Sequence, residues 1–289
     1  MTDHETAWGD AIHCYLGPRT AKPRRAGITA VIDKGLGLHA TDDLVEMAGQ
    51  VIDHVKFGFG TTATVGVEVL RRKIARLVDA GMLVYPGGTL LEGAWASGRL
   101  AAFVSRAREL GFTGVEVSDG TVDMPAEARA EAIRRAQDAG LHVVTEVGRK
   151  DPERQPSPEE MAERLLADLE LGADFVTIEA RESGRGTGVF DASGHVVESK
   201  VDALVGPVAD PLRILWEAPI QDQQSYLILR FGPNVNLANI PTADILAVEA
   251  LRRGLRFETL HAALEGRGGE WAKIPLGAPH GAPRGAGTP

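Results

Sequence analysis

The stretch Val143-Val144-Thr145-Glu146-Val147-Gly148-Arg149-Lys150 decides the fold of this chain. Its first five residues are mostly apolar and rich in β-branched side chains, which is typical of a buried parallel strand. A glycine and two adjacent cations follow, and they predict a loop whose charged residues are functional. Because several other segments show the same order of features, this stretch predicts a repeating strand-and-loop unit.

Eight such units follow one another, at residues 27–35, 51–62, 82–89, 112–120, 143–150, 174–181, 213–219 and 234–240. Their spacing of about 30 residues is that of a (β/α)8 barrel. We therefore expect one TIM-type barrel of parallel strands over residues 26–262, after an N-terminal arm (1–25) and before a disordered Gly/Pro-rich tail (263–289). A doubly wound open sheet is the alternative, but no Gly-x-Gly-x-x-Gly motif follows the first strand.

Helices are expected between the strands. The first should start at Thr41-Asp42-Asp43, because such residues favour helix N-termini. Others are expected over about 63–80, up to Leu110, and over 125–139, 159–171, 221–231 and 241–254. The basic patch Lys22-Pro23-Arg24-Arg25 is expected to belong to a solvated arm, with an entry into the first strand as the alternative.

The composition excludes several classes of function. The chain has 289 residues, 44% of them hydrophobic and 25% charged, as in soluble globular proteins. Its formal net charge of −9 argues against partners such as nucleic acid or an anionic membrane surface. The single cysteine, Cys14, excludes an intrachain disulfide. No apolar run reaches the ~20 residues that a membrane span needs, and no signal peptide is evident, so we expect a cytoplasmic protein.

Nearly every expected strand ends in an ionisable or amide side chain. In a barrel these ends meet at one mouth, where barrel enzymes have their active sites. For any single residue, a purely structural charge is as good an explanation as a functional one, whereas the whole set favours function. The set comprises Asp33, Lys34, Lys56, Thr89, Glu92, Glu116, Asp119, Glu146, Arg149, Lys150, Glu179, Arg181, Glu217, Asn236 and Asn239.

The loop after the sixth strand predicts an anion site. Arg181, Ser183, Gly184 and Arg185 offer guanidinium groups, a hydroxyl and unhindered backbone N–H groups, which is how a phosphate is bound. A flexible glycine-rich loop is the alternative. No Walker-type motif is present, so a nucleotide is not implied. Asn236 and Asn239, on the eighth unit, are further candidates for substrate binding.

The carboxylates predict a hard divalent cation. Glu116, Asp119, Glu146, Glu179 and Glu217 lie on neighbouring strands and could not all stay ionised without a compensating charge, and the first four are the expected metal ligands. Mg²⁺ that keeps several water ligands would supply this charge. Ion pairs with Lys34, Lys56, Lys150 and Arg181 are the competing explanation. Zinc is not expected, since the eight histidines lack ligand spacing, and His54 and His142 are interpreted as core or helix-side groups.

The sequence offers little for nucleophilic catalysis. Cys14 lies outside the expected barrel, Ser118 has no neighbouring histidine, and no Gly-x-Ser-x-Gly motif occurs. Acid–base and electrostatic chemistry on an anionic substrate remains. Lys34, Lys56 and Lys150 are the candidate proton donors.

The chain resembles the phosphosulfolactate synthase family. The resemblance is carried by segments in every unit from about residue 26 to 260: 33–36, 55–61, 85–92, 115–120, 145–150, 179–184 with 188–191, 217–219 with 223–224, 234–240 and 251–256. It implies a Mg²⁺-dependent carbon–sulfur lyase with a (β/α)8 barrel. The implied reaction adds sulfite to C3 of phosphoenolpyruvate, and a lysine protonates C2, giving (2R)-phospho-3-sulfolactate.

The resemblance also assigns roles within the fifth unit. A lysine pair of the family falls on Arg149-Lys150, which makes Lys150 the expected general acid and Arg149 an anion-binding group. An assembly of identical subunits is expected as well. Two alternatives stay open: the same chemistry with another nucleophile or a related phosphorylated enol acid, and a non-catalytic barrel that acts in stress protection or assembly. The resemblance extends to the heat-stress-associated proteins of plants.

Overall fold

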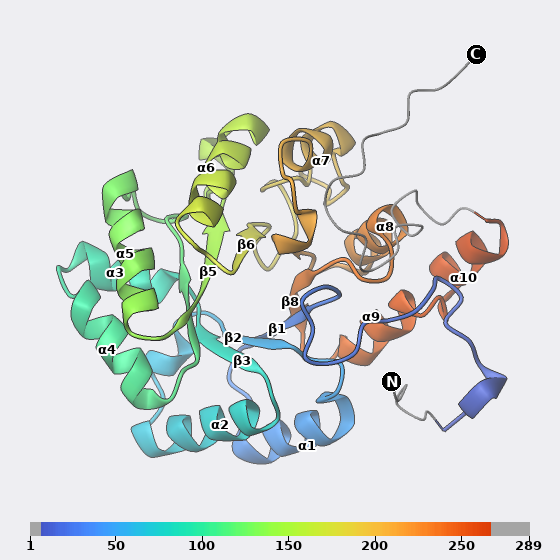
Figure 1. Ribbon diagram of the computed structural model, residues 1–289, viewed down its shortest axis with the longest axis horizontal. Helices are drawn as coiled ribbons and strands as arrows, with labels where there is room; N and C mark the ends of the chain where they lie inside the picture. Colours follow the sequence, from blue (N-terminus) through green and yellow to red (C-terminus); the bar gives the residue numbers. More distant parts are fainter. Residues whose placement is uncertain (1–6, 267–289) are drawn as a thin grey trace.

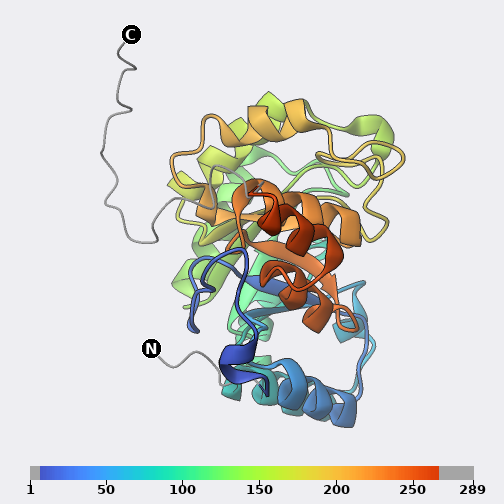
Figure 2. The same cartoon turned by 90° about the vertical axis from the view of Figure 1, so that its right-hand side faces the viewer.

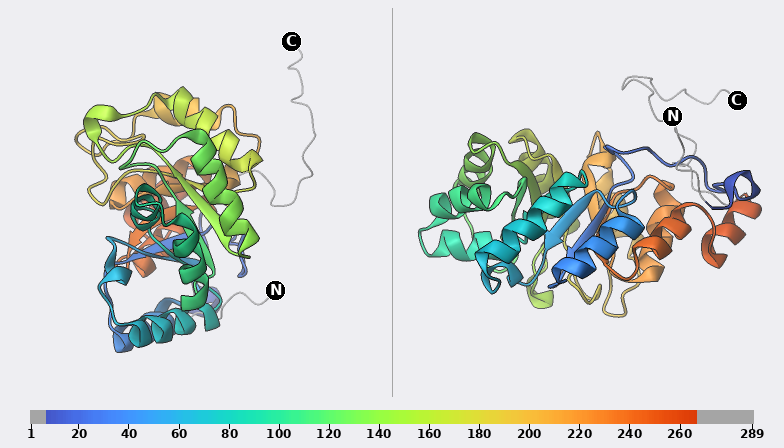
Figure 3. Two further views of the ribbon diagram at one scale, coloured as in Figure 1. Left: turned by 90° about the vertical axis from the view of Figure 1, so that its left-hand side faces the viewer. Right: turned by 90° about the horizontal axis from the view of Figure 1, so that it is seen from below.

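The computed structural model describes residues 7–266 and has the expected barrel. Eight parallel strands, one from each expected unit, are arranged in the order β3-β2-β1-β8-β7-β6-β5-β4. They are β1 (Thr29–Asp33), β2 (His54–Phe57), β3 (Leu83–Pro86), β4 (Gly114–Val117), β5 (His142–Val147), β6 (Phe175–Ile178), β7 (Ile214–Glu217) and β8 (Leu237–Pro241). The helices surround these strands (Figure 1), and the two views of Figure 3 show the same arrangement.

The barrel is nearly closed between β3 and β4. At this seam Thr113, just before β4, donates its backbone N–H to the carbonyl of Val84 at 3.1 Å. Its hydroxyl oxygen accepts a hydrogen bond from the N–H of Val84 at 2.9 Å. The side chain thus supplies a link that regular strand pairing supplies elsewhere in the sheet.

Ten α-helices occur in the described part of the chain. They are α1 (Leu38–Ala48), α2 (Val67–Asp79), α3 (Thr89–Ala96), α4 (Leu100–Leu110), α5 (Ala126–Asp138), α6 (Pro158–Glu170), α7 (Glu198–Val205), α8 (Gln221–Phe231), α9 (Ile245–Arg252) and α10 (Phe257–Leu264). Short 3-10 turns lie at Gly9–Ala11, Thr61–Ala63, Pro152–Arg154 and Pro211–Arg213.

The helices differ from the prediction in four main places. The first helix begins at Leu38, not at Thr41, because Thr41 is buried inside the helix and its hydroxyl donates to the carbonyl of Gly37 at 2.9 Å. The segment up to Leu110 forms two helices, α3 and α4, separated by the turn at Gly98. Two helices were not expected: α7, which follows the glycine-rich loop after β6, and α10, which follows the last expected helix.

The N-terminus of α6 shows why local sequence predicts most of these helices. Ser157 accepts a hydrogen bond from the N–H of Glu160 at 3.1 Å, and Glu160 accepts one from the N–H of Ser157 at 2.7 Å. Pro158 occupies the first helical position, where its missing N–H costs nothing. This reciprocal capping satisfies two backbone donors that the helix itself cannot satisfy.

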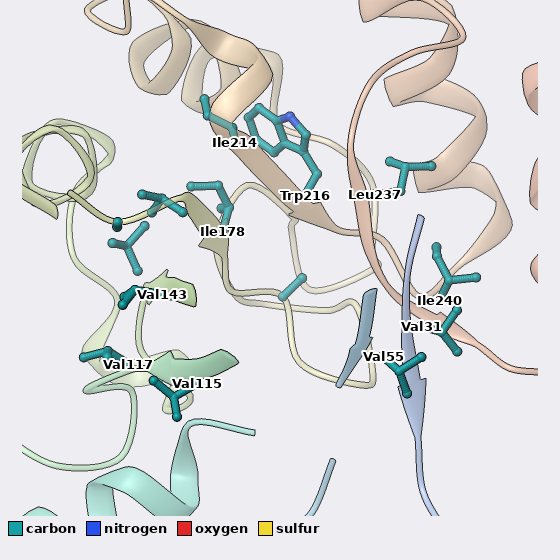
Figure 4. Packing of buried hydrophobic residues seen from close by; sticks show 14 of the residues in the cluster. Val31, Val55, Val115, Val117, Val143, Ile178, Ile214, Trp216, Leu237 and Ile240 are labelled. Atoms are coloured by element: carbon teal, nitrogen blue, oxygen red, sulfur yellow. The ribbon is translucent and has the colours of Figure 1, made fainter. Parts of the chain in front are cut away.

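The main hydrophobic core lies between the barrel and its helices. Figure 4 shows it from close by, with strand residues such as Val55, Val115, Ile178, Trp216 and Ile240 pointing outward from the barrel. A smaller cluster fills the barrel interior and contains Ile28, Ala30, Tyr85, Val144, Leu215 and Ala238. Because side chains alternate along a strand, strands such as β1, β3, β5, β7 and β8 supply both cores.

The N-terminal segment packs against the N-terminal end of the barrel. Arg19 forms an ion pair with Glu249 of α9 at 3.1 Å, and Arg24 forms one with Asp53 at 3.0 Å. Figure 2 shows this segment (dark blue) beside the C-terminal helices (red). Lys22 and Arg24 of the basic patch are therefore tied to the barrel, whereas Arg25 is exposed. Most of the expected disordered tail, from residue 267 on, lies outside the described residues.

Candidate active site

A cavity of about 520 Å³ opens at the C-terminal ends of the strands. Residues from all eight strand-and-loop units or their immediate continuations contribute to its rim or wall. Its lining consists of Ile32, Lys56, Gly58, Phe59, Gly60, Gly87, Gly88, Thr89, Glu116, Glu146, Lys150, Glu179, Arg181, Glu182, Ser183, Glu217 and Asn239. The end of the barrel at which active sites are found in this fold is thus the charged end.

Strand alternation directs the charged side chains into this cavity. In β4, Val115 and Val117 pack outward in the main core, so Glu116 between them points inward. The same alternation places Lys56 of β2 and Glu217 of β7 inside the barrel. A pattern with period two, visible in the sequence, therefore builds the inner wall of the site.

Lys56 is the centre of a first cluster. Its Nζ lies 2.9 Å from Glu116 Oε1, 3.0 Å from Glu146 Oε2 and 3.2 Å from Glu217 Oε1. Each of these three glutamate side chains is 1% exposed, and that of Lys56 is 12% exposed. One ammonium group thus compensates part of the charge of three buried carboxylates.

Lys150 is the centre of a second cluster, which shares Glu146 with the first. Its Nζ lies 2.8 Å from Glu146 Oε1, 3.2 Å from Glu179 Oε2 and 3.7 Å from Glu92 Oε1. The Lys150 side chain is 30% exposed and is the more accessible of the two lysines. Glu146 therefore links one ammonium group deep in the barrel to one that faces the open cavity.

Backbone N–H groups fix the other oxygens of these carboxylates. Gly88 donates to Glu116 Oε2 at 2.7 Å, and Ala180 donates to Glu217 Oε2 at 2.9 Å. A Cβ atom at Gly88 would lie 2.5 Å from the Ser118 hydroxyl oxygen, so a side chain there would push Ser118 or the Gly88 backbone out of place. The glycine at this position is required by close packing.

The glutamates differ in their tendency to hold a proton. Burial raises the pKa of Glu116 to about 7, although Lys56 opposes this shift. Burial and the neighbouring Glu146 also raise the pKa of Glu179 well above its usual range. Burial acts upward on the pKa of Glu146 too, but Lys150 and Lys56 outweigh it and lower that pKa. The site thus places an ionised carboxylate between two lysines and carboxyl groups able to carry protons around it.

The two lysines stay charged. Burial acts to lower the pKa of each lysine, but the neighbouring glutamates outweigh it. These are Glu116 and Glu146 for Lys56, and Glu146 and Glu179 for Lys150. Both pKa values consequently lie above their ordinary value. Each lysine enters a reaction at neutral pH as an ammonium group.

Backbone strain is concentrated at this cavity. In the described residues, the non-glycine residues with φ in the left-handed region are Phe59 (56°), Arg181 (60°) and Asn239 (54°), and all three line it. Such conformations are unfavourable for residues with a Cβ and tend to occur at functional sites. At Arg181 the conformation lets the backbone N–H donate to Glu179 Oε1 at 2.6 Å. At Asn239 the side-chain Oδ1 is also buried, and it has no hydrogen-bond partner among the described residues.

The structure brings eight of the predicted site residues into this one cavity: Lys56, Lys150, Glu116, Glu146, Glu179, Arg181, Ser183 and Asn239. Lys34 lies at the rim instead. It is paired there with Glu182, and its Nζ is 5.3 Å from the centre of the Phe59 ring.

Arg149 and Asp119 lie outside the cavity lining. Arg149 donates to the carbonyls of Asp119 and Val122, both at 2.8 Å, and pairs with Asp123. The Asp119 carboxylate lies 3.1 Å from Arg129 Nη1. In this structure both side chains hold loops together rather than facing the cavity.

Three further predicted residues lie elsewhere. Asn236 precedes β8, and its Oδ1 accepts from the N–H of Ile28 at 2.9 Å, so it sits at the opposite end of the barrel from the expected mouth. Gly184 presents its carbonyl to Gln223 Nε2 at 2.7 Å, away from the cavity lining. Arg185 is also absent from the lining.

Two buried glutamates that the sequence placed at the mouth, without naming them as metal ligands or catalytic groups, also take part in the site. Glu217 contacts Lys56, and Glu92 of α3 receives hydrogen bonds from the Ser118 hydroxyl and from the N–H of Thr121. Glu217 ends a strand as the expected metal ligands do, whereas Glu92, expected just after the third strand, lies in the first turn of α3.

No group of three or more acidic, histidine or cysteine side chains is arranged to hold a metal ion in the described part of the chain. Two carboxylate oxygens in the cavity, Glu116 Oε1 and Glu179 Oε2, are nevertheless buried and have no hydrogen-bond partner there, although each faces a lysine ammonium group. Mg²⁺ commonly takes one or two protein carboxylates and completes its shell with water and substrate oxygens. The carboxylates fit that mode of binding and not an all-protein cage.

Comparison with known proteins connects the geometry to a family. A family model described as (2R)-phospho-3-sulfolactate synthase matches residues 17–258. A phosphosulfolactate synthase of Methanocaldococcus jannaschii is 45% identical over 235 residues, which are 81% of this chain and 93% of that protein. A phosphosulfolactate synthase of Methanothermobacter thermautotrophicus is 42% identical over 246 residues, covering 84% and 95%.

Solved structures agree on the fold. The 3-hexulose-6-phosphate synthase of Salmonella typhimurium superimposes with a TM-score of 0.52 at 16% identity, covering 82% of this chain and 98% of that one. At this identity the likeness concerns the fold alone. No helix in residues 7–266 is long and apolar enough to cross a membrane.

Proposed function

The chain belongs to the (2R)-phospho-3-sulfolactate synthase family, and from this premise we propose that its barrel mouth catalyses the addition of sulfite to C3 of phosphoenolpyruvate. The product is (2R)-phospho-3-sulfolactate. The observation that carries the proposal is the pair of charged lysines, Lys56 and Lys150, joined by the ionised Glu146 on the wall of one cavity.

The cavity suits a small anion with two charged ends. Its volume of about 520 Å³ falls in the range of small-molecule sites. Lys150 is partly exposed to it, and Arg181 lines its rim with Nη1 anchored on the carbonyl of Lys150 at 3.2 Å. A guanidinium and an ammonium group held side by side can contact both a phosphate and a carboxylate.

The excess of carboxylates supports a requirement for Mg²⁺. Glu92, Glu116, Glu146, Glu179 and Glu217 outnumber Lys56 and Lys150 in the two clusters, so the bare site would repel an anionic substrate. Mg²⁺, when bound, supplies positive charge next to the substrate carboxylate, where negative charge develops. Glu116 and Glu179 would hold it, because their raised pKa values mark them as the carboxylates least compensated by the lysines.

The residues of the chain account for the movement of electrons and of the proton. The sulfur lone pair of sulfite forms the bond to C3, and the electron pair of the C2=C3 double bond moves toward C2 and the carboxylate. Lys150 then donates a proton from Nζ to C2, which completes the addition without an oxidant or reductant. Glu146 and Glu179, 2.8 and 3.2 Å from Nζ, hold the Lys150 ammonium group in place for this transfer.

The test is an incubation of the full chain with phosphoenolpyruvate, sulfite and Mg²⁺, followed by mass detection of a phosphorylated sulfonate. The expected product retains the phosphate and contains, relative to phosphoenolpyruvate, the atoms of one sulfite ion and one additional proton. Omitting sulfite and replacing Lys150 by alanine serve as controls. Binding of phosphoenolpyruvate with no sulfonate formed would refute the proposal and favour another nucleophile. Absence of both binding and turnover would instead favour a non-catalytic barrel.

A further inference from the structure

A second cavity lies at the other end of the barrel, where the strands begin. Its volume is about 650 Å³. The wall is built by the first residues of several strands, by the residues just before them and by the N-terminal segment 22–26. Nothing in the chemistry proposed for the mouth uses this cavity.

The cavity is positively charged although the chain as a whole is acidic. Lys22, Arg25 and Arg213 line it and form no ion pair within the described residues. Lys22 and Arg213 are held by backbone carbonyls, of Gly49 at 2.8 Å and of Asp174 at 3.1 Å, which fix the cations without neutralising them.

The three aspartates on its wall are already engaged. Asp53 pairs with Arg24 at 3.0 Å, Asp174 accepts from the N–H of Val143 at 2.9 Å, and Asp210 accepts from the N–H of Leu212 at 3.1 Å. Four cationic side chains thus stand against three carboxylates, which leaves the lining one positive charge in excess, with Lys22, Arg25 and Arg213 outside any ion pair of the described residues. An anion entering it would find partners that the protein itself does not supply.

His54 marks the inner end of this cavity. It lines the wall, is 5% exposed, and its Nδ1 is buried without a hydrogen-bond partner in the described chain. Such an unpaired buried polar atom is costly unless something binds to it. Burial lowers the pKa of His54 to about 3, so the ring is neutral and can donate or accept one hydrogen bond according to its tautomer. Phe175 packs edge-on against the ring, with centroids 5.4 Å apart, and adds an apolar surface.

We propose that this cavity is a binding site for a small organic anion. Its phosphate, sulfonate or carboxylate group contacts Lys22, Arg25 and Arg213, and its body packs on Phe175 and hydrogen-bonds to His54. The volume favours an organic molecule over an inorganic ion alone. The site is separate from the mouth and does not depend on the reaction proposed there. Its ligand should therefore bind together with phosphoenolpyruvate rather than compete with it.

The test follows the His54 side chain by NMR in the full chain with ¹⁵N-labelled histidine. Phenyl phosphate and inorganic phosphate are the probes, and titrations are made with the mouth saturated by phosphoenolpyruvate. The His54 signal, identified by its loss in His54→Gln, should shift with saturation. Phenyl phosphate should bind more tightly than inorganic phosphate, because only it can use the apolar surface.

Matched variants locate the binding. Arg213→Gln should raise the dissociation constant of phenyl phosphate roughly three- to tenfold, whereas Arg213→Lys should retain most of the affinity. Arg25→Gln, at an exposed position, gives a second measurement if Arg213→Gln fails to fold. Arg134→Gln, an exposed change on α5, controls for net charge and should have no effect.

A His54 signal that stays unchanged at saturating phenyl phosphate would overturn the proposal. Equal affinities of wild type, Arg213→Gln and Arg25→Gln would do so as well. Binding that disappears in Arg181→Ala would assign the ligand to the mouth and would also refute a separate site.

Discussion

Replacing Lys56 by methionine tests whether one buried ammonium group compensates three carboxylates. The change keeps most of the side-chain volume and removes the charge. Lys56 Nζ has Glu116, Glu146 and Glu217 within 2.9–3.2 Å, and their side chains are 1% exposed. Removing one partner of a buried ion pair costs about 3–5 kcal/mol, so the unfolding free energy at neutral pH should fall by about that much.

The pH dependence of this loss is the more specific expectation. In the wild type, Lys56 has a raised pKa, so its stabilisation is fully present below its ordinary pKa of 10.5 and creates no slope near neutral pH. In the variant the carboxylates lose their cation, their pKa values rise, and the folded state retains protons that the unfolded state has released. Each retained proton lowers the unfolding free energy by about 1.4 kcal/mol per pH unit as the pH rises. One such proton gives about 2.7 kcal/mol between pH 6 and 8.

Denaturant unfolding at several pH values measures both quantities. Lys73→Met is the matched control, since Lys73 is also buried but pairs with one carboxylate, that of Asp33. Asp33 retains hydrogen bonds from the backbone N–H groups of Gly35 and Leu36, at 2.7 and 2.9 Å. As the pH rises, the unfolding free energy of Lys73→Met should therefore fall less steeply than that of Lys56→Met. Parallel profiles for wild type and Lys56→Met would refute the shared compensation.

Three further changes address the mouth. Lys150→Ala should abolish sulfonate formation, measured by mass detection, with a modest change in unfolding free energy, and retained turnover would remove Lys150 from the acid role. Arg181→Ala should mainly raise the KM for phosphoenolpyruvate in steady-state assays, whereas an unchanged KM would argue against an anion-binding role. The pKa of the Glu116 carboxyl is raised from 4.5 to about 7, so this group lowers the unfolding free energy of the wild type as the pH rises through that window. Between pH 4.5 and 8, the unfolding free energy of Glu116→Gln should therefore increase by about 3 kcal/mol relative to that of the wild type. Equal pH profiles of the two proteins in denaturant unfolding would contradict that expectation.

Repeated local patterns were enough to predict the barrel. Short apolar runs, each followed by a loop and an amphipathic helix, fixed the number and the order of the strands. Their positions at the ends of expected strands also made Lys56, Glu116 and Glu146 candidates for the barrel mouth, and all three line its cavity. These features depend on neighbours in the chain and can therefore be deduced without knowing the fold.

The predictions became less accurate where side chains leave the regular strands. Arg149 and Lys150 are adjacent in sequence, yet Lys150 contacts Glu146 and Glu179 while Arg149 holds the loop near Asp123. Past the end of a strand, a side chain's direction depends on the loop conformation and on partners distant in sequence. Glu92 was expected at the mouth after the third strand, but its contacts with Ser118 and Thr121 likewise depend on a segment distant in sequence.

The sequence by itself determined the barrel, the end at which the charges gather, and the types of residue that gather there, because strand period and unit length are local properties. Only the tertiary structure decided which of these charges share a cavity, that Glu146 stands between two lysines, and that His54 lies unpaired at the opposite end. Those features arise when segments far apart in the chain are packed together. Burial then sets the charge of each group, and burial is a property of the folded molecule.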